Sequence, residues 1–218
     1  MRMRSADKIQ FLVTSRRSEI ETVEKILNIQ FVKIALDPLD VAESIEVLRN
    51  GASLTCDIDA DTKGELREIS ELCENIPLAL RLAGPLLEKE SECTFEERKQ
   101  NLDKNATRAL DVKPMMQIAF EKLEESLQRA LVSLSVFPKS FKRGAALAIL
   151  GDDRAAALKK RCLIQKQDDR CLIHLLIRDY AKEIGKRDEF RQTRSEGKQG
   201  FLKHFLSLVL KNAKKYCG

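Results

Sequence analysis

Apolar residues recur every three or four positions through most of the chain beyond residue 40, and this spacing predicts a helical protein. In the first such segment, Val41, Ile45 and Leu48 fall on one face of a helix. Asp40 stands directly before this segment as an N-cap, and Gly51 marks its end. Segments of the same kind follow one another to the C-terminus, so the predicted fold class is mostly α with minor β.

A few stretches depart from the helical pattern and predict strands. An apolar run at residues 9–13 is typical of a strand buried in a parallel sheet, and a second short apolar run covers residues 31–36. Farther along, two apolar stretches flank the polar pair Asp168 and Asp169, which predicts a β-hairpin. Helices followed by such a hairpin are the layout of a winged helix.

The composition of the 218 residues narrows the class of protein. Hydrophobic residues make up 43% and charged residues 33%, which indicates a folded globular chain. No window nears the roughly 18 uninterrupted apolar residues of a membrane span, and no apolar signal segment opens the chain. The six cysteines form no CxxC pair, so no metal site is predicted. We expect a cytoplasmic protein with reduced thiols.

The positive charge of the chain is concentrated at its C-terminal end. Residues 181–218 carry ten Lys/Arg and four Asp/Glu, whereas the other 180 residues carry 29 and 30, from totals of 39 and 34. No aromatic platform is interleaved with these cations, so a solvated helix face is favoured over a nucleic-acid surface.

Four stretches along the chain carry recognisable motifs, and their order is as informative as their content. They read KIQFLVTSRR (8–17), CENIPLALRLAGPLL (73–87), LVSLSVFPKSF (131–141) and CLIHLLIRDYAKEI (171–184). In this order they resemble the sensor strand, the GLPL motif, the opening of the winged-helix subdomain and the MHD motif of the NB-ARC family. That family comprises signalling ATPases of the STAND class, such as plant immune receptors and the apoptotic protease-activating factor.

The resemblance implies four nucleotide-binding residues. Arg16 matches the sensor arginine that approaches the γ-phosphate, and a guanidinium there suits bidentate phosphate contact. Pro77, followed by Leu78, matches the proline that packs against adenine. His174 matches the MHD histidine, which contacts the β-phosphate of ADP. Leu175 stands where the family has aspartate, and its side chain can instead pack in the core.

Each of these residues also has a purely structural interpretation. Arg16 can be a surface arginine after a strand, and Pro77 a proline in the first turn of a helix. His174 can be a half-buried core histidine among leucines. Asn75 replaces the first glycine of the GLPL motif, and asparagine tolerates the left-handed backbone that such a turn needs.

The family's phosphate loop, G-x-x-x-x-G-K-[ST], is absent, and no strand ending in paired acidic residues precedes residues 8–17. The resemblance covers roughly residues 5–185 and begins where the family's domain is about two-thirds complete. Phosphoryl transfer needs phosphate-binding amides, a lysine and magnesium. We therefore expect no catalytic residue, no metal and no ATPase activity. The expected function is that of a truncated regulatory module, for which ADP or ATP is a weakly bound or lost cofactor.

The resemblance implies four parts of the chain: a C-terminal remnant of a nucleotide-binding α/β sheet (1–36), a small helical subdomain with the GLPL-like motif (37–113), a winged-helix subdomain with the MHD-like motif (114–188) and a basic helical tail (189–218). The expected partners are proteins or other chains of a signalling assembly, with no membrane. The alternative function is a winged-helix interaction module that binds a protein or, ranked lower, DNA through the helix holding Lys159, Lys160 and Arg161.

Overall fold

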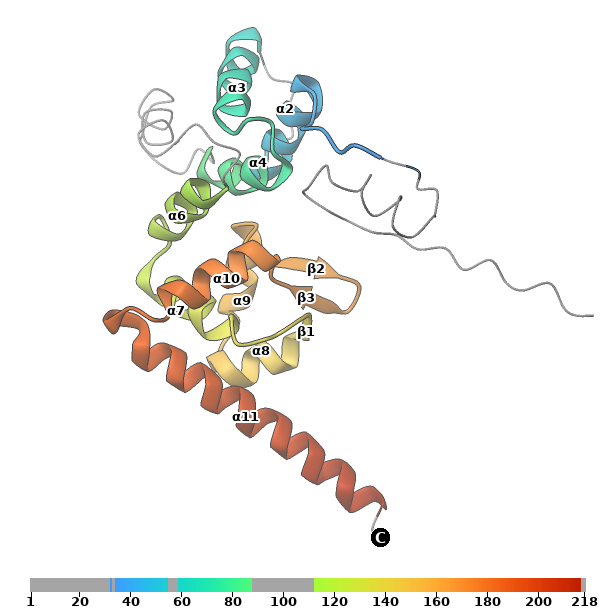
Figure 1. The fold of residues 1–218 in the computed structure, drawn as a ribbon, viewed down its shortest axis with the longest axis vertical. Helices are drawn as coiled ribbons and strands as arrows, with labels where there is room; N and C mark the ends of the chain where they lie inside the picture. The colour runs from blue at the N-terminus through green and yellow to red at the C-terminus, as the bar shows by residue number, and fades with distance from the viewer. Residues whose placement is uncertain (1–31, 33, 55–58, 88–111, 217–218) are drawn as a thin grey trace, which may run out of the picture. The chain divides into compact units, whose positions relative to one another are not determined.

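The computed structural model describes Val32 and residues 34–54, 59–87 and 112–216, with the side chains placed up to residue 213 (Figure 1). Arg16 and the predicted strand at residues 9–13 lie outside these residues. The strand predicted at residues 31–36 is wrong for the part that is described: Val32 and residues 34–36 have no strand and are exposed. A strand forms only beside a partner strand, and these residues pair with none in the described chain.

Contacts along the chain separate Met1–Asp37 from Pro38–Gly218, and every element described below belongs to the second unit. Its first group contains the helices α2 (Val41–Gly51), α3 (Ala60–Leu72) and α4 (Pro77–Ala83), and α4 runs directly into the 3-10 helix η1 (Gly84–Leu87). Figure 1 shows these helices gathered together. Their apolar faces meet in a core that contains Leu48, Ile69, Leu80 and Leu82.

Local chemistry accounts for how these helices begin and turn. The Asp40 carboxylate accepts a hydrogen bond from the Glu43 N–H at 2.8 Å, and the Asp40 N–H donates to the Glu43 carboxylate at 3.2 Å, which completes a capping box. Asn75 lies in the left-handed region with φ of 54°, as the sequence predicts. Pro77 then opens α4, where a missing N–H costs nothing.

Two glycines let α2 approach η1 closely. A Cβ atom added to Gly84 would stand only 2.7 Å from the Cα of Gly51. The Gly84-Pro85 pair therefore marks both the change from α-helix to 3-10 helix and a close helix contact.

The second group contains the described elements that follow η1, and it begins with α6 (Lys113–Glu121) and α7 (Glu125–Leu134). The Gln128 side chain donates hydrogen bonds to the carbonyl oxygens of Phe120 and Leu123, both at 3.1 Å, and so holds the turn between these two helices. The later elements are β1 (Phe141–Lys142), α8 (Arg143–Leu150), α9 (Arg154–Lys160), β2 (Gln165–Gln167), β3 (Arg170–Leu172), α10 (Leu175–Ile184) and α11 (Asp188–Tyr216).

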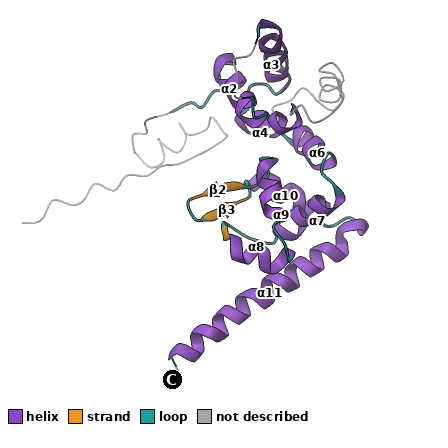
Figure 2. Cartoon of the chain, turned by 180° about the vertical axis from the view of Figure 1, so that it is seen from behind, coloured by secondary structure: helices purple, strands orange, loops and turns teal. Residues whose placement is uncertain are grey.

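The sheet is small and antiparallel, with the strand order β1-β3-β2. Lys166 pairs with Cys171, and Asp168 adopts a left-handed φ of 53° in the turn between β2 and β3. The predicted hairpin is thus confirmed, and so is the fold class of mostly α with minor β. Figure 2 shows the strands beside a predominantly helical chain.

Aromatic rings join the long helix α11 to the rest of this group. Phe190 packs edge-on against Phe120, with ring centroids 5.8 Å apart, and Phe201 packs edge-on against Phe137 at 5.4 Å. A Cβ atom at Gly197 would lie 2.9 Å from the Ser133 backbone, so glycine permits α11 to lie directly against α7. Among the described residues, no helix is long and apolar enough to cross a membrane.

Candidate functional site

His174 lies between the end of β3 and the start of α10, where it is the N-cap of that helix. Its Nδ1 atom accepts a hydrogen bond from the Leu176 N–H at 3.3 Å. An accepting nitrogen carries no proton, so the neutral ring must hold its proton on Nε2. The sequence therefore folds this histidine as a helix cap whose other nitrogen is a hydrogen-bond donor.

The surroundings of His174 favour the uncharged ring. Partial burial lowers its pKa below the ordinary value, and the nearby positive charge of Arg81 lowers that pKa further. His174 is consequently neutral around pH 7, and it offers a ligand a neutral N–H rather than a second positive charge.

Pro77, Leu78 and Arg81 all belong to α4. Pro77 is exposed at the first position of the helix, whereas Leu78 is half-buried against the core. Arg81 stands one turn beyond Pro77, which places the two residues on neighbouring parts of the same helix face. The structural interpretation of Pro77 as a first-turn proline is thus confirmed, and its exposed ring leaves room for contact with a ligand.

Arg81 connects α4 with the hairpin. With the Gln165 amide oriented so that its oxygen faces Arg81, that oxygen accepts hydrogen bonds from Nη1 at 2.5 Å and Nη2 at 3.3 Å. Arg161, the residue that directly follows α9, also donates from its side chain to the Pro85 carbonyl oxygen at 3.4 Å. The Arg81 contact brings the GLPL-like stretch to β2, which pairs with the strand that precedes His174, although more than eighty residues separate Arg81 from Gln165 in sequence.

The sequence interpretation missed Arg81, which is the residue that links two of the predicted sites. Its position four residues after Pro77 was a usable signal, because residues spaced by four share a helix face. Arg16 lies outside the described residues, so the described site does not include it.

The structure corrects the interpretation of Leu175 as a core residue. Its side chain is 55% exposed, and Ile177 takes the buried position instead. The cap geometry explains this outcome: once His174 caps the helix, Leu175 becomes the first helical residue and points away from the core. An exposed leucine thus stands directly beside the histidine.

No described residues form a cluster of three or more histidine, cysteine or acidic side chains that could hold a metal ion. Burial raises the pKa of Cys73 to about 12, which makes its thiol unsuited to nucleophilic chemistry near neutral pH.

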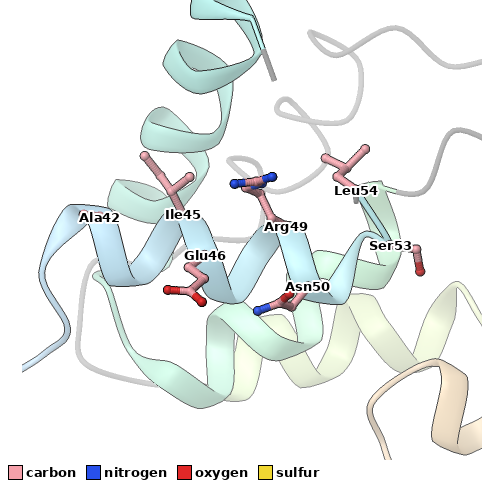
Figure 3. Close-up of a pocket in the computed structure, with 7 residues that line it drawn as sticks. All are labelled: Ala42, Ile45, Glu46, Arg49, Asn50, Ser53 and Leu54. Atoms are coloured by element: carbon pink, nitrogen blue, oxygen red, sulfur yellow. The ribbon is translucent and has the colours of Figure 1, made fainter. Parts of the chain in front are cut away.

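A surface hollow of about 530 Å³ lies along α2 and the turn that follows it (Figure 3). It is lined by Ala42, Ile45, Glu46, Arg49, Asn50, Ser53 and Leu54. Pro77, Leu78 and His174, the predicted nucleotide-binding residues that the structure describes, do not line this hollow.

The candidate DNA-reading helix is α9, with Lys159 and Lys160 exposed at its end. Arg161 instead reaches the Pro85 carbonyl oxygen of η1. One of the three clustered cations is thus engaged within the protein, which weakens the interpretation of this segment as a major-groove reader.

The fold and site together define a mostly helical protein in which a histidine that caps α10, in the second group of elements, lies near an arginine of α4, in the first group. In sequence, the chain is 24% identical over 156 residues to the disease resistance RPP13-like protein 4 of Arabidopsis thaliana. This match covers 57% of the present chain and 18% of that protein, so the similarity is distant and partial. No protein-family model matches the chain.

Proposed function

We propose that this chain is the regulatory portion of an NB-ARC-type signalling switch and that it binds adenine nucleotide, ADP in particular, beside His174. The contact of Arg81 with Gln165, next to His174, is the observation that carries the proposal. Arg81 belongs to the stretch that resembles the adenine-side motif, and Gln165 pairs across the hairpin with Leu172, which belongs to the stretch that resembles the phosphate-side motif. In this proposal residues 114–188 form the winged helix, and the element order from α7 to α10 supports that assignment.

The chemistry of the two side chains suits a diphosphate. The Arg81 guanidinium can donate two parallel hydrogen bonds to phosphate oxygens, and the Nε2–H of His174 can donate a third. Gln165 already orients the Arg81 fork. The exposed ring of Pro77 offers an apolar surface for adenine, with Leu78 packed behind it.

Binding of an anion changes the electrostatics of His174. Arg81 disfavours the protonated ring in the ligand-free protein, and a phosphate that neutralises Arg81 removes this effect. Phosphate also attracts the imidazolium directly. Binding therefore raises the pKa of His174, and by linkage the affinity for ADP increases as the pH falls toward the histidine range.

The proposed role is nucleotide sensing without hydrolysis, because no phosphate loop occurs in these 218 residues. The similarity to a protein named for disease resistance supports a role in innate-immune signal transduction, since the NB-ARC family includes plant immune receptors. The resemblance also implies partners among the other chains of a signalling assembly, and the location that we propose is the cytoplasm.

Isothermal titration of the full chain with ADP tests the proposal. We expect saturable binding in the high micromolar range, weakened about tenfold by Arg81→Ala or His174→Ala, since a hydrogen bond to a charged group contributes about 1.5–3 kcal/mol. Lys166→Ala is the matched control, because Lys166 is an exposed cation on the same strand as Gln165. Wild-type affinity should rise between about pH 7.5 and pH 6, and His174→Ala should remove this rise.

Two results would contradict the proposal. The absence of saturable heat at high micromolar ADP would show that the chain has no such nucleotide site. Unchanged binding in both variants would show that ADP binds at a place other than Arg81 and His174. Hydrolysis of ATP by the purified chain, with contaminating ATPases excluded, would refute the sensing role without hydrolysis.

A further inference from the structure

A groove of about 600 Å³ runs between α10 and α11, on a part of the surface that holds none of the proposed nucleotide-binding residues. The end of α7 closes it at Ser135 and Val136, and Phe201 and Leu202 of α11 supply apolar side chains. Lysines and arginines line its sides, so it combines an apolar floor with a basic rim. We refer to it as the α10–α11 groove.

The basic side chains of the groove exceed its acidic ones. Lys182 is 3.8 Å from the carboxylate of Asp179. The other acidic side chain of the groove, Glu183, lies 3.8 Å from Lys113. Both acidic side chains of the groove therefore already face a cation. These are exposed pairs, and each contributes little to stability.

Three further cations line the groove, namely Lys186, Arg194 and Lys198. In the described part of the chain, none of these three forms an ion pair with a carboxylate. Their charge is therefore not compensated by a carboxylate of the described chain, which favours an acidic ligand.

The apolar floor continues along α11 beyond the groove. Phe205, Leu206 and Val209 follow Leu202 at spacings of three and four residues, which keeps them on the same face of the helix. Leu206 is 59% exposed and Val209 is 64% exposed. Figures 1 and 2 show that the C-terminal end of α11 extends past α8. The stretch from Arg194 to Val209 is about 23 Å long at the rise of an α-helix.

The shape and charge of this surface select one kind of occupant. A second copy of the chain is disfavoured, because no Asp or Glu follows Glu196 and the same face of a copy would bring lysines against lysines. A flat bilayer fits a concave groove poorly. A helix about 10 Å across fits it well, with apolar residues at helical spacing toward the floor and carboxylates toward the cations.

We propose that the α10–α11 groove and the apolar face of α11 from Leu202 to Val209 bind an acidic amphipathic helix of a partner protein. The cations at the groove steer the partner and set its register, and the apolar side chains provide most of the contact area. This inference does not depend on nucleotide binding.

The test uses the full chain and a synthetic amphipathic peptide of about 20 residues, with leucines on one face and glutamates on the other. Fluorescence anisotropy of the labelled peptide should show saturable binding that weakens with added salt. A matched peptide with lysine in place of every glutamate should not bind. Combined Lys186→Glu, Arg194→Glu and Lys198→Glu substitutions should weaken binding at least about tenfold, as reversal of facing charges produces.

Two further double variants test the apolar contact and provide a control for charge reversal outside the groove. Leu206→Ser with Val209→Ser should also weaken binding, and both substitutions change exposed side chains that the folded core does not need. Lys159→Glu with Lys160→Glu, which reverses two exposed cations of α9 away from the groove, should leave binding unchanged. Circular dichroism of each variant should match that of the wild type.

Several outcomes would overturn the proposal. Equal binding of the acidic and basic peptides, no binding of either, or no effect of the groove substitutions would show that this surface has no preference for an acidic helix. A wild-type dimer that Leu206→Ser and Val209→Ser dissolve would make a second copy the occupant. Flotation with vesicles that contain phosphatidylserine, lost in the same variant, would make it an anionic lipid surface.

Discussion

Replacement of Gly84 by alanine tests the contact between α2 and η1 with little change in local conformation. Gly84 has φ of −48° and ψ of −55°, an ordinary right-handed conformation that alanine adopts readily. The added Cβ atom would lie 2.7 Å from the Gly51 Cα atom, 3.0 Å from the Gly51 carbonyl carbon and 3.1 Å from the Leu48 oxygen. All three atoms belong to the α2 backbone, so rotation of a side chain cannot relieve the clash.

The size of the effect follows from these distances. Ordinary contact with a Cβ atom begins at 3.4 Å, so η1 and α2 must separate by about 0.7 Å. Overpacking of this kind costs about 1–3 kcal/mol, and contact with rigid backbone belongs to the upper part of that range. Alanine restricts the unfolded chain and so recovers about 0.4–1 kcal/mol. We expect Gly84→Ala to lower the free energy of unfolding by about 1–2 kcal/mol.

The matched control is Gly64→Ala in α3, where no atom lies within 4 Å of the added Cβ atom. That variant should be more stable by about 0.5–1 kcal/mol, because alanine is the better helix former. Urea unfolding followed by far-ultraviolet circular dichroism measures both variants. A Gly84→Ala protein as stable as Gly64→Ala would refute the close contact between the two helices.

Two further predictions concern His174 and Asp40. The pKa of His174 is lowered in the folded protein, so the unfolded chain binds a proton at this residue first as the pH falls. The free energy of unfolding should therefore be unchanged above about pH 7.5 and fall as the pH drops through the ordinary histidine range. It should level off below the pKa of the folded protein. Urea titrations at several pH values should show this fall in the wild type and a smaller one in His174→Gln. Asp40→Ala should cost about 1 kcal/mol because it removes the capping box with Glu43, whereas Asp40→Asn should retain most of the stability in the same urea assay.

Features that depend on near neighbours in sequence could be predicted from the sequence. The cap at Asp40, the helix start at Pro77, the left-handed Asn75 and the hairpin turn at Asp168 each follow from the chemistry of a few adjacent residues. The strand expected at residues 31–36 is wrong at Val32 and residues 34–36, the part that the structure describes, for the opposite reason. Apolar content alone does not make a strand, because a strand also needs a hydrogen-bonding partner that no local pattern specifies.

The candidate site could be predicted only in part, because its central contact is between residues far apart in sequence. His174 and Pro77 were found from motif order, but the sequence gives no register between α4 and the hairpin, so the pairing of Arg81 with Gln165 could not be foreseen. Packing of Leu175 in the core was one interpretation of the sequence. Its exposure follows from where the helix begins, and an uncertainty of one residue there reverses the direction of a side chain.

The cap at His174 couples the charge of its ring to the start of α10, and the proposed switch depends on this coupling. While Nδ1 accepts the Leu176 N–H, the ring is neutral and its orientation is fixed relative to α10. Protonation of Nδ1 would turn this acceptor into a donor and break the cap, so the charge state of His174 is coupled to the start of α10. Partial burial disfavours that charge on the ring, and Arg81, which belongs to a different helix, disfavours it further. A phosphate that neutralises Arg81 would therefore act on α4 and α10 together, which is the coupling that a nucleotide-dependent change between two helical groups requires.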